Sequence, residues 1–181
     1  MSKARPSILV GAFVALSCAA CSPSTPAASA DPRPAPTADV VKVVDGDTID
    51  VRDDQRGRLR IRVLGIDTPE TVDPNRTVGC WGPEASAFAR DALAGQRVAL
   101  VGDPTQDSHD KYGRTLAYIV KADGWDYSIE AARAGAARSV VFGRNPVERQ
   151  GAIAAAEQEA REGHVGMWGP PCWGNTQSTP R

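Results

Sequence analysis

Three residues near the middle of the chain, Arg62, Asp67 and Glu70, have the types and spacing needed for chemistry on a phosphate group. Apolar and arginine side chains alternate over residues 58–63, which is the period of a strand with one apolar and one charged face. A glycine then allows a bend, and a Thr-Pro pair ends the strand. One small region would therefore hold a guanidinium that grips phosphate oxygens, a metal-type carboxylate and a general base. The alternative is a solvated basic strand followed by an ordinary turn.

Two further segments carry polar residues in tight turns. The segment Asp45-Gly46-Asp47-Thr48 places two carboxylates around a glycine, an arrangement that recurs in calcium sites and also in ordinary hairpins. The segment Asp110-Lys111-Tyr112-Gly113-Arg114 is a turn with a basic residue at the mouth of a strand. Neither segment identifies a site by itself, so their order along the chain has to be considered.

Composition indicates one globular domain and excludes a uniformly basic nucleic-acid binder. The chain has 181 residues, of which 41% are hydrophobic and 24% are charged. Residues 39–181 hold 18 Lys and Arg against 21 Asp and Glu, a formal charge of −3. A protein that binds nucleic acid through its overall field should be basic. Any such contact must therefore come from local clusters, such as the five arginines within residues 52–62.

The first 20 residues are typical of a bacterial export signal. Lys3 and Arg5 precede an apolar run over residues 8–17 that is too short to span a bilayer. A cysteine after small residues also resembles a lipoprotein signal, in which Cys21 would become the lipidated first residue. The alternative is plain secretion with cleavage within residues 20–30. The protein is therefore expected to be a cell-surface lipoprotein or secreted, with membrane contact only through such an anchor.

The pattern beyond the signal predicts a tether, a folded domain and a short tail. Residues 21–38 are rich in Pro, Ala and Ser and should be an unpacked, disordered tether. The folded domain is expected over 39–173, and a flexible tail over 174–181. Strands are predicted at 40–44, 48–52, 58–66, 97–101 and 114–120, and helices beginning near 83, 126 and 146 and ending at Gly95, Gly135 and Gly163. This order predicts an α+β domain, mainly β, with an OB-fold, a five-stranded and partly open barrel with three helices, as the candidate.

Two cysteines remain outside the predicted signal, Cys80 and Cys172. In an exported protein an even pair is more often joined than free, which predicts a disulfide between them. That bond would connect the loop after Glu70 to the C-terminal tail. The alternative is two unrelated thiols.

Four motifs in order resemble the staphylococcal nuclease (thermonuclease) family. They are Val44-Asp45-Gly46-Asp47-Thr48, then Arg62 with Asp67-Thr68-Pro69-Glu70, then Gly82-Pro83-Glu84-Ala85, then Asp110-Lys111-Tyr112-Gly113-Arg114. The resemblance covers essentially Val40 to Trp168. The fold of that family, an OB-fold barrel with three helices, agrees with the pattern of predicted elements.

The resemblance implies a single Ca²⁺ ion. Asp47 and Asp67 match the carboxylates that bind it, and Thr68 matches the residue that adds a backbone carbonyl. Asp45 stands where the family has a further carboxylate behind the ligands.

The resemblance also implies the catalytic groups. Glu70 matches the proposed general base, and Arg62 and Arg114 match the arginines that hold the phosphate and its developing charge. Lys111 and Tyr112 match residues that contact a terminal phosphate of the bound nucleotide.

One stretch departs from the family pattern. The family often places two tyrosines after the second helix, where they line the nucleotide site, whereas residues 139–143 here contain only one aromatic residue, Phe142. Base stacking contributes about 1–3 kcal/mol per base, so weaker binding is expected.

The interpretation that these features favour is an exported, Ca²⁺-dependent nuclease, expected to be a monomer. Its substrates would be DNA and RNA, single-stranded preferred, and its products a 3′-phosphate and a 5′-hydroxyl. A non-catalytic OB-fold module that binds nucleic acid at the cell surface is one alternative. A surface domain whose fold is only braced by Ca²⁺ is another.

Overall fold

The computed structural model describes residues 33–181 of the chain. The predicted export signal, the candidate lipidation site at Cys21 and most of the predicted tether lie outside these residues. Among residues 33–181, no helix is long and apolar enough to cross a membrane.

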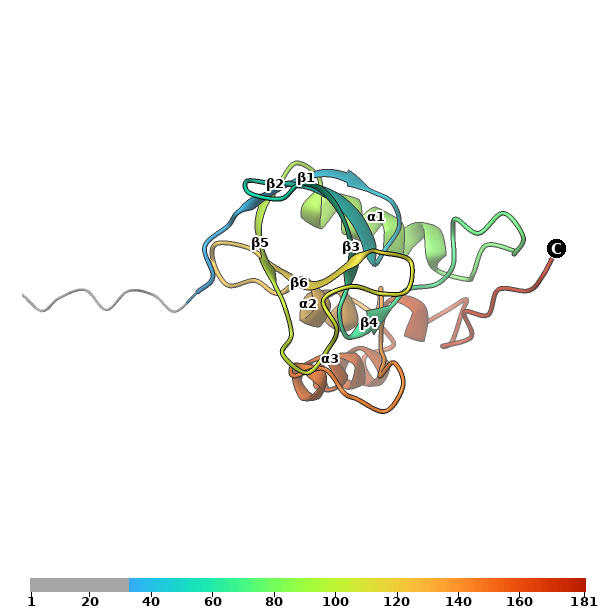
Figure 1. Cartoon of the computed structure of the whole chain (residues 1–181). Helices are drawn as coiled ribbons and strands as arrows, with labels where there is room; N and C mark the ends of the chain where they lie inside the picture. Colours follow the sequence, from blue (N-terminus) through green and yellow to red (C-terminus); the bar gives the residue numbers. More distant parts are fainter. Residues whose placement is uncertain (1–32) are drawn as a thin grey trace, which may run out of the picture. The chain divides into compact units, whose positions relative to one another are not determined.

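Five strands form a closed barrel, which Figure 1 shows from one end. The strands lie in the order β1-β2-β3-β6-β5, and the predicted OB-type α+β fold is confirmed. The barrel is closed, where a partly open one was expected, because β1 pairs with β5 at Ala38–Val98 and Asp39–Arg97. The strands are β1 (Ala38–Val43), β2 (Thr48–Asp53), β3 (Gly57–Val63), β5 (Arg97–Val101) and β6 (Thr115–Val120).

Strand register brings distant motifs to one end of the barrel. The antiparallel pairing of β2 with β3 sets Thr48 opposite Arg62. The parallel pairing of β3 with β6 sets Arg62 beside Leu116, so Arg114 lies just before the start of the neighbouring strand. The motifs at 45–48, 62 and 110–114 therefore meet at one edge.

The predicted strand over 58–66 is two strands. It breaks after Val63, and β4 (Ile66–Asp67) pairs with β7 (Arg138–Ser139) in a separate two-stranded sheet. Gly65 makes the break, because its φ of 76° is one that other residues rarely adopt. A β-carbon there would also lie 2.5 Å from Cδ1 of Ile153. The chain thus turns toward the helices at Gly65, and the predicted metal ligand Asp67 follows two residues later, in β4.

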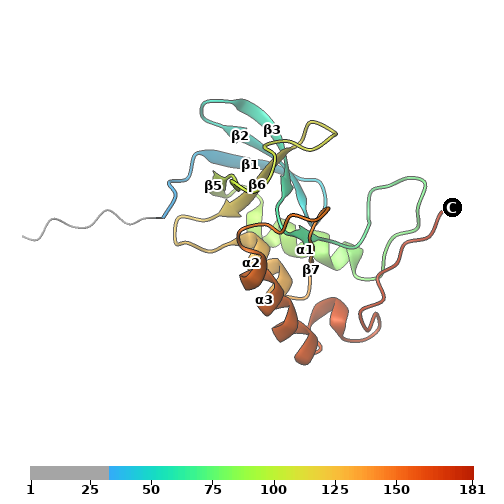
Figure 2. The ribbon, with the colours of Figure 1, turned by 60° about the horizontal axis from the view of Figure 1, so that its bottom comes forward.

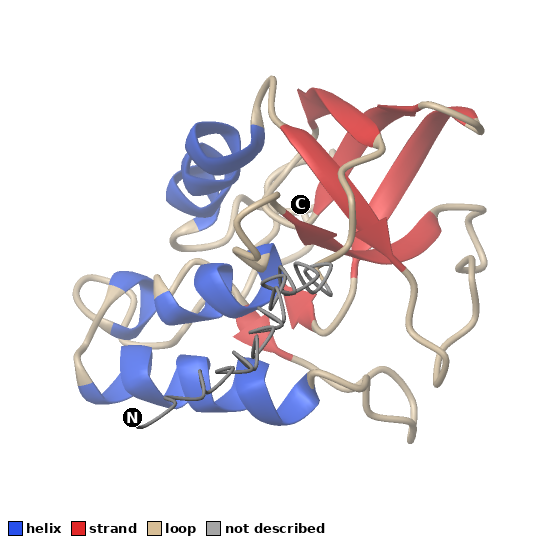
Figure 3. Cartoon of the chain, turned by 90° about the vertical axis from the view of Figure 1, so that its left-hand side faces the viewer, coloured by secondary structure: helices blue, strands red, loops and turns tan. Residues whose placement is uncertain are grey.

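Three α-helices gather beside the barrel, as Figure 3 shows, and α2 and α3 lie side by side in Figure 2. They are α1 (Gly82–Leu93), α2 (Tyr127–Arg133) and α3 (Gln150–Glu162), followed by the short 3-10 helix η1 (Gly166–Trp168).

The third helix begins at Gln150, later than the predicted start near 146. The backbone N–H of Glu148 donates to Asp103, at 2.7 Å, and that of Arg149 donates to the hydroxyl of Tyr118, at 3.2 Å. These residues bond to the barrel in place of a helical turn.

The predicted disulfide joins Cys80 to Cys172, with 5.8 Å between their Cα atoms. Residues 174–181, expected to be flexible, lie along the loop of residues 70–79, as Figure 1 shows at the C-terminal end. The N–H of Thr77 donates to the carbonyl of Thr179 at 2.8 Å, and the N–H of Arg181 donates to the carbonyl of Asn75 at 2.9 Å. The tail pairs with the loop because the disulfide holds the start of the tail beside it. The tail therefore loses less conformational entropy when these hydrogen bonds form.

Candidate active site

The turn between β1 and β2 is packed directly against Thr68. The buried carboxylate of Asp47 accepts the N–H of Thr68 at 2.9 Å and its hydroxyl at 3.0 Å. A β-carbon on Gly46 would lie 2.7 Å from the Thr68 side chain, so only glycine allows this approach. The predicted ligands Asp47 and Thr68, 21 residues apart, are thereby in contact.

Arg62 bridges the two predicted metal carboxylates. Its Nη1 lies 3.1 Å from Oδ1 of Asp47, and its Nη2 donates to Oδ1 of Asp67 at 2.8 Å. Nη1 also donates to the carbonyl of Ile66 at 3.0 Å, and the side chain is only 10% exposed. Because three partners from two segments hold this guanidinium, its orientation is set before any substrate arrives.

Arg114 is connected to Asp47 through Thr48. Its Nε donates to Asp110 at 2.6 Å, and its Nη1 donates to the hydroxyl of Thr48 at 3.4 Å. The hydroxyl of Thr48 in turn donates to Oδ1 of Asp47 at 3.1 Å. Two hydrogen bonds and the ion pair of Asp47 with Arg62 therefore connect the two arginines across the mouth of the barrel.

Glu70 begins the loop of residues 70–79. Its Oε1 accepts the backbone N–H groups of Val72, at 2.7 Å, and Asp73, at 2.9 Å. Its carbonyl accepts the N–H of Gly79 at 2.8 Å, which closes the loop on itself. The carboxylate is thus anchored through one oxygen to its own loop.

These groups line one polar cavity of about 280 Å³. Seven of the predicted site residues contribute to it: Asp45, Asp47, Arg62, Asp67, Thr68, Glu70 and Arg114. Four carboxylates and two guanidinium groups give it a formal charge of −2. The structure therefore brings the three predicted motifs together.

Crowding of the carboxylates shifts two pKa values. Burial, with repulsion from Asp47, raises the pKa of Asp45 to about 6. Burial and the same repulsion also raise the pKa of Asp67, against the opposing effect of Arg62. Negative charge therefore exceeds what the arginines neutralise, which favours a bound cation.

The donor set fits a calcium ion whose coordination is completed by other oxygens. Among residues 33–181, no three Asp, Glu, His or Cys side chains are placed to hold a metal by themselves. Asp47 and Asp67 with the Thr68 carbonyl would supply three oxygens, and Ca²⁺ takes six to eight, waters included. The charge of the cavity is equal and opposite to that of one such ion.

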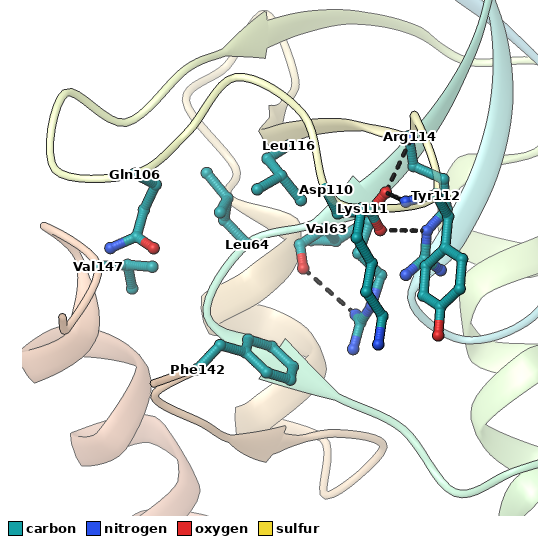
Figure 4. Close-up of a pocket in the computed structure, with 11 residues that line it drawn as sticks. Val63, Leu64, Gln106, Asp110, Lys111, Tyr112, Arg114, Leu116, Phe142 and Val147 are labelled. Carbon is teal, nitrogen blue, oxygen red and sulfur yellow. Dashed lines mark hydrogen bonds and ion pairs between the residues drawn. The ribbon is translucent and has the colours of Figure 1, made fainter. Parts of the chain in front are cut away.

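A second cavity of about 500 Å³ adjoins the first and shares Arg62 and Arg114 with it. Figure 4 shows the predicted substrate-binding residues Lys111 and Tyr112 on one wall and Phe142 across from them. Tyr112 is 72% and Phe142 58% exposed, and each ring also packs against a site arginine, Arg114 at 5.5 Å from the Tyr112 ring centre and Arg62 at 5.4 Å from that of Phe142. The single aromatic residue of the 139–143 stretch thus lies where a base could pack.

Two supporting residues were not predicted. The hydroxyl of Thr48 links Arg114 to Asp47, although the sequence shows it only as part of the turn motif. The buried Tyr127 donates its hydroxyl to the carbonyl of Gly46 at 2.5 Å. No pattern in the sequence indicates this contact, because Tyr127 reads as a core residue in the first turn of a helix.

Two preorganised arginines beside a cluster of carboxylates, at one end of a closed barrel, suit chemistry on a phosphodiester. Residues 60–170 match the family described as "Staphylococcal nuclease homologue", and the chain belongs to this family. It is accordingly a nuclease.

Relatives extend the match over most of the chain. The chain is 40% identical to a thermonuclease of Staphylococcus intermedius over 129 residues, which cover 71% of this chain and 74% of that protein. It is 36% identical to a thermonuclease of Staphylococcus hyicus over 163 residues, 89% of this chain and 94% of that one. An uncharacterized endonuclease of Escherichia coli O157:H7 is 32% identical over 130 residues, 71% of this chain and 74% of that protein. These names support the nuclease over the non-catalytic alternatives.

Proposed function

We propose that this nuclease is exported and Ca²⁺-dependent, and that it cleaves single-stranded DNA and RNA to 3′-phosphate and 5′-hydroxyl products. The observation that carries the proposal is the convergence of residues 45–48, 62–70 and 114 on one cavity with the charge of one divalent cation to balance.

The two arginines stabilise the charge that builds on the phosphate. Arg62 is held by Asp47 and Asp67, and Arg114 by Asp110. Donors fixed in this way need little reorganisation free energy when the transition state forms. Removing one such donor commonly lowers the rate by roughly 10²–10³. Neither guanidinium needs to move far to reach a phosphate in the cavity between them.

Glu70 orients and deprotonates the attacking water. Its Oε1 is bound to the loop backbone, so the carboxylate keeps its position while taking up a proton. A positioned general base contributes typically about 10²–10⁴ in rate. When bound by Asp47, Asp67 and Thr68, Ca²⁺ supplies a Lewis acid that partly neutralises the phosphate.

The leaving nucleoside occupies the cavity lined by Tyr112 and Phe142. In-line displacement places the leaving 5′-oxygen opposite the water held by Glu70. The larger cavity contains both arginines and not Glu70, so it lies on the leaving side. Its aromatic rings suit bases of either nucleic acid, because every base has a face that can stack.

Cleavage of a single-stranded oligonucleotide by the full chain tests this function. We expect cutting in Ca²⁺, none in a chelator, and fragments that end in a 3′-phosphate. Glu70→Gln should lower kcat by orders of magnitude, whereas the control Glu162→Gln, on the exposed face of α3, should not. Cutting that resists the chelator would contradict the proposed metal dependence.

Export rests on the first 20 residues, which lie outside the described part. The Cys80–Cys172 disulfide supports it, because such bonds persist in oxidising compartments. Cell fractionation tests export, and incorporation of a labelled fatty acid that disappears in Cys21→Ala tests lipidation. Label-free protein in the culture medium would favour plain secretion.

A further inference from the structure

A third cavity, of about 220 Å³, lies on the other side of the catalytic carboxylates. It shares residues 67–70 with the catalytic cavity and no residue with the cavity of Tyr112 and Phe142. Its remaining wall consists of Arg76, Arg138 and two hydroxyl residues of the C-terminal tail, Thr176 and Ser178. The catalytic cavity therefore has a neighbour on each of two sides.

The two guanidinium groups of this cavity have only neutral hydrogen-bond partners. Arg76 donates to the hydroxyl of Ser178 at 2.8 Å and to the Ser178 carbonyl. Arg138 donates to the hydroxyl of Thr176 at 3.1 Å and to the carbonyl of Gly174. Within residues 33–181 neither arginine forms an ion pair with a carboxylate. The tail thus positions both side chains through neutral groups.

The two carboxylates in the wall, Asp67 and Glu70, already have hydrogen-bond partners of their own. Asp67 accepts from Arg62 at 2.8 Å, and Oε1 of Glu70 accepts two backbone N–H groups of its loop. Arg138 is partly buried against Trp168, with its guanidinium 4.6 Å from the ring centre.

We infer that Arg76 and Arg138, with the tail hydroxyls, bind the phosphate one nucleotide to the 5′ side of the cleaved bond. The inference rests on the proposed function, in which the leaving nucleoside fills the opposite cavity. The strand on the 5′ side must then leave the catalytic cavity past Glu70, where these arginines lie. Because the domain is acidic overall, a neighbouring phosphate needs local cations of this kind.

The test compares two substrates that differ by one phosphate. One is a thymidine dinucleotide, and the other is the same dinucleotide with a 5′-phosphate, which supplies the anion for the third cavity. For the wild-type chain we expect kcat/KM to be about tenfold higher with the 5′-phosphate, since hydrogen bonds to charged groups commonly contribute this much. Calorimetric binding of both dinucleotides to Glu70→Gln gives the same comparison if turnover is slow.

Arg76→Ala should bring that ratio to about one, whatever it does to cleavage of the unphosphorylated dinucleotide through the loop, and Arg76→Lys should restore part of the ratio. Arg90→Ala is the matched control, because it removes the same charge from an exposed position on α1 that lines none of the three cavities.

Each result decides the matter. If Arg76→Ala lowers cleavage of both dinucleotides equally, Arg76 only holds the loop and the subsite is wrong. A wild-type ratio near one, with both substrates cleaved, also overturns the subsite and leaves the proposed function intact. If neither dinucleotide is cleaved or bound, the proposed function fails and the subsite with it.

Discussion

The barrel side and the loop side of the catalytic cavity are built in different ways. Thr48 and Arg62 lie on paired strands, and their positions follow from the register of the sheet. Glu70 begins a loop of ten residues, 70–79, that contains no helix or strand element. The groups that stabilise charge are thus set by strand pairing, whereas the group that activates water depends on how a loop is held.

The loop is held from outside by the end of the chain. Arg76 and Thr77 hydrogen-bond to residues 178 and 179, which lie 102 positions further along. Cys80, immediately after the loop, is covalently joined to Cys172. The tail therefore does for the loop what neighbouring strands do for the barrel, and the two sides can be perturbed separately.

The largest loss of activity is expected from a substitution on the barrel side of the cavity. Arg62→Gln should lower kcat by roughly 10²–10³, because it removes a preorganised donor to the phosphate. Steady-state cleavage of single-stranded DNA measures it. Arg58→Gln, an exposed change on the same strand, is the control and should keep wild-type activity. Equal losses in the two variants would mean that general charge on β3 matters more than the bridge to Asp47 and Asp67.

The disulfide should matter more to stability than any one hydrogen bond of the loop. Replacing both Cys80 and Cys172 by Ser should lower the free energy of unfolding by about 2–5 kcal/mol, because the bond closes a long loop in the unfolded chain. Urea denaturation measures the change, and the wild-type chain under reducing conditions should show the same loss. A midpoint unchanged by reduction would contradict this expectation.

Removing the tail should affect the loop and spare the barrel. In a chain that ends after Gly174, the amide of Thr77 loses its acceptor on Thr179, so hydrogen exchange over 71–79 should accelerate. Because Glu70 is then less well positioned, kcat should fall about tenfold, while amides of β2 and β3 keep their protection. Unchanged exchange in the loop would show that the disulfide alone holds it.

The smallest effect is expected for Asp103, at the junction of barrel and helices. It is a change in the free energy of unfolding that depends on pH. Burial alone would raise the pKa of Asp103, but hydrogen bonds from Thr105, Tyr118 and Glu148 lower it to about 2. Its contribution to stability is complete above the unfolded value near 4 and is lost as the pH falls through about 2. Asp103→Asn should therefore cost about 1 kcal/mol at pH 7. The difference from wild type should shrink between pH 4 and pH 2 in urea titrations, and a constant difference would contradict this account.

The sequence predicted those parts of the molecule that follow from local pattern. Alternation located four barrel strands to within two residues and the start of β3 to within one, and glycines marked the helix ends. The order of motifs predicted seven of the eleven residues that line the catalytic cavity, and the two cysteines left outside the signal predicted the disulfide. These features depend on side chains close together in sequence, or on a family pattern that retains their spacing.

Tertiary structure decided the rest, because it depends on contacts between distant residues. Nothing local distinguishes Arg76 and Arg138 from other arginines until the tail lies beside them. The break at Gly65, the late start of α3 and the support from Tyr127 likewise arise from packing of the barrel against the helices. The periodicity of the sequence predicts which face of its own element a side chain lies on. Which residue that side chain contacts is determined by how the elements pack.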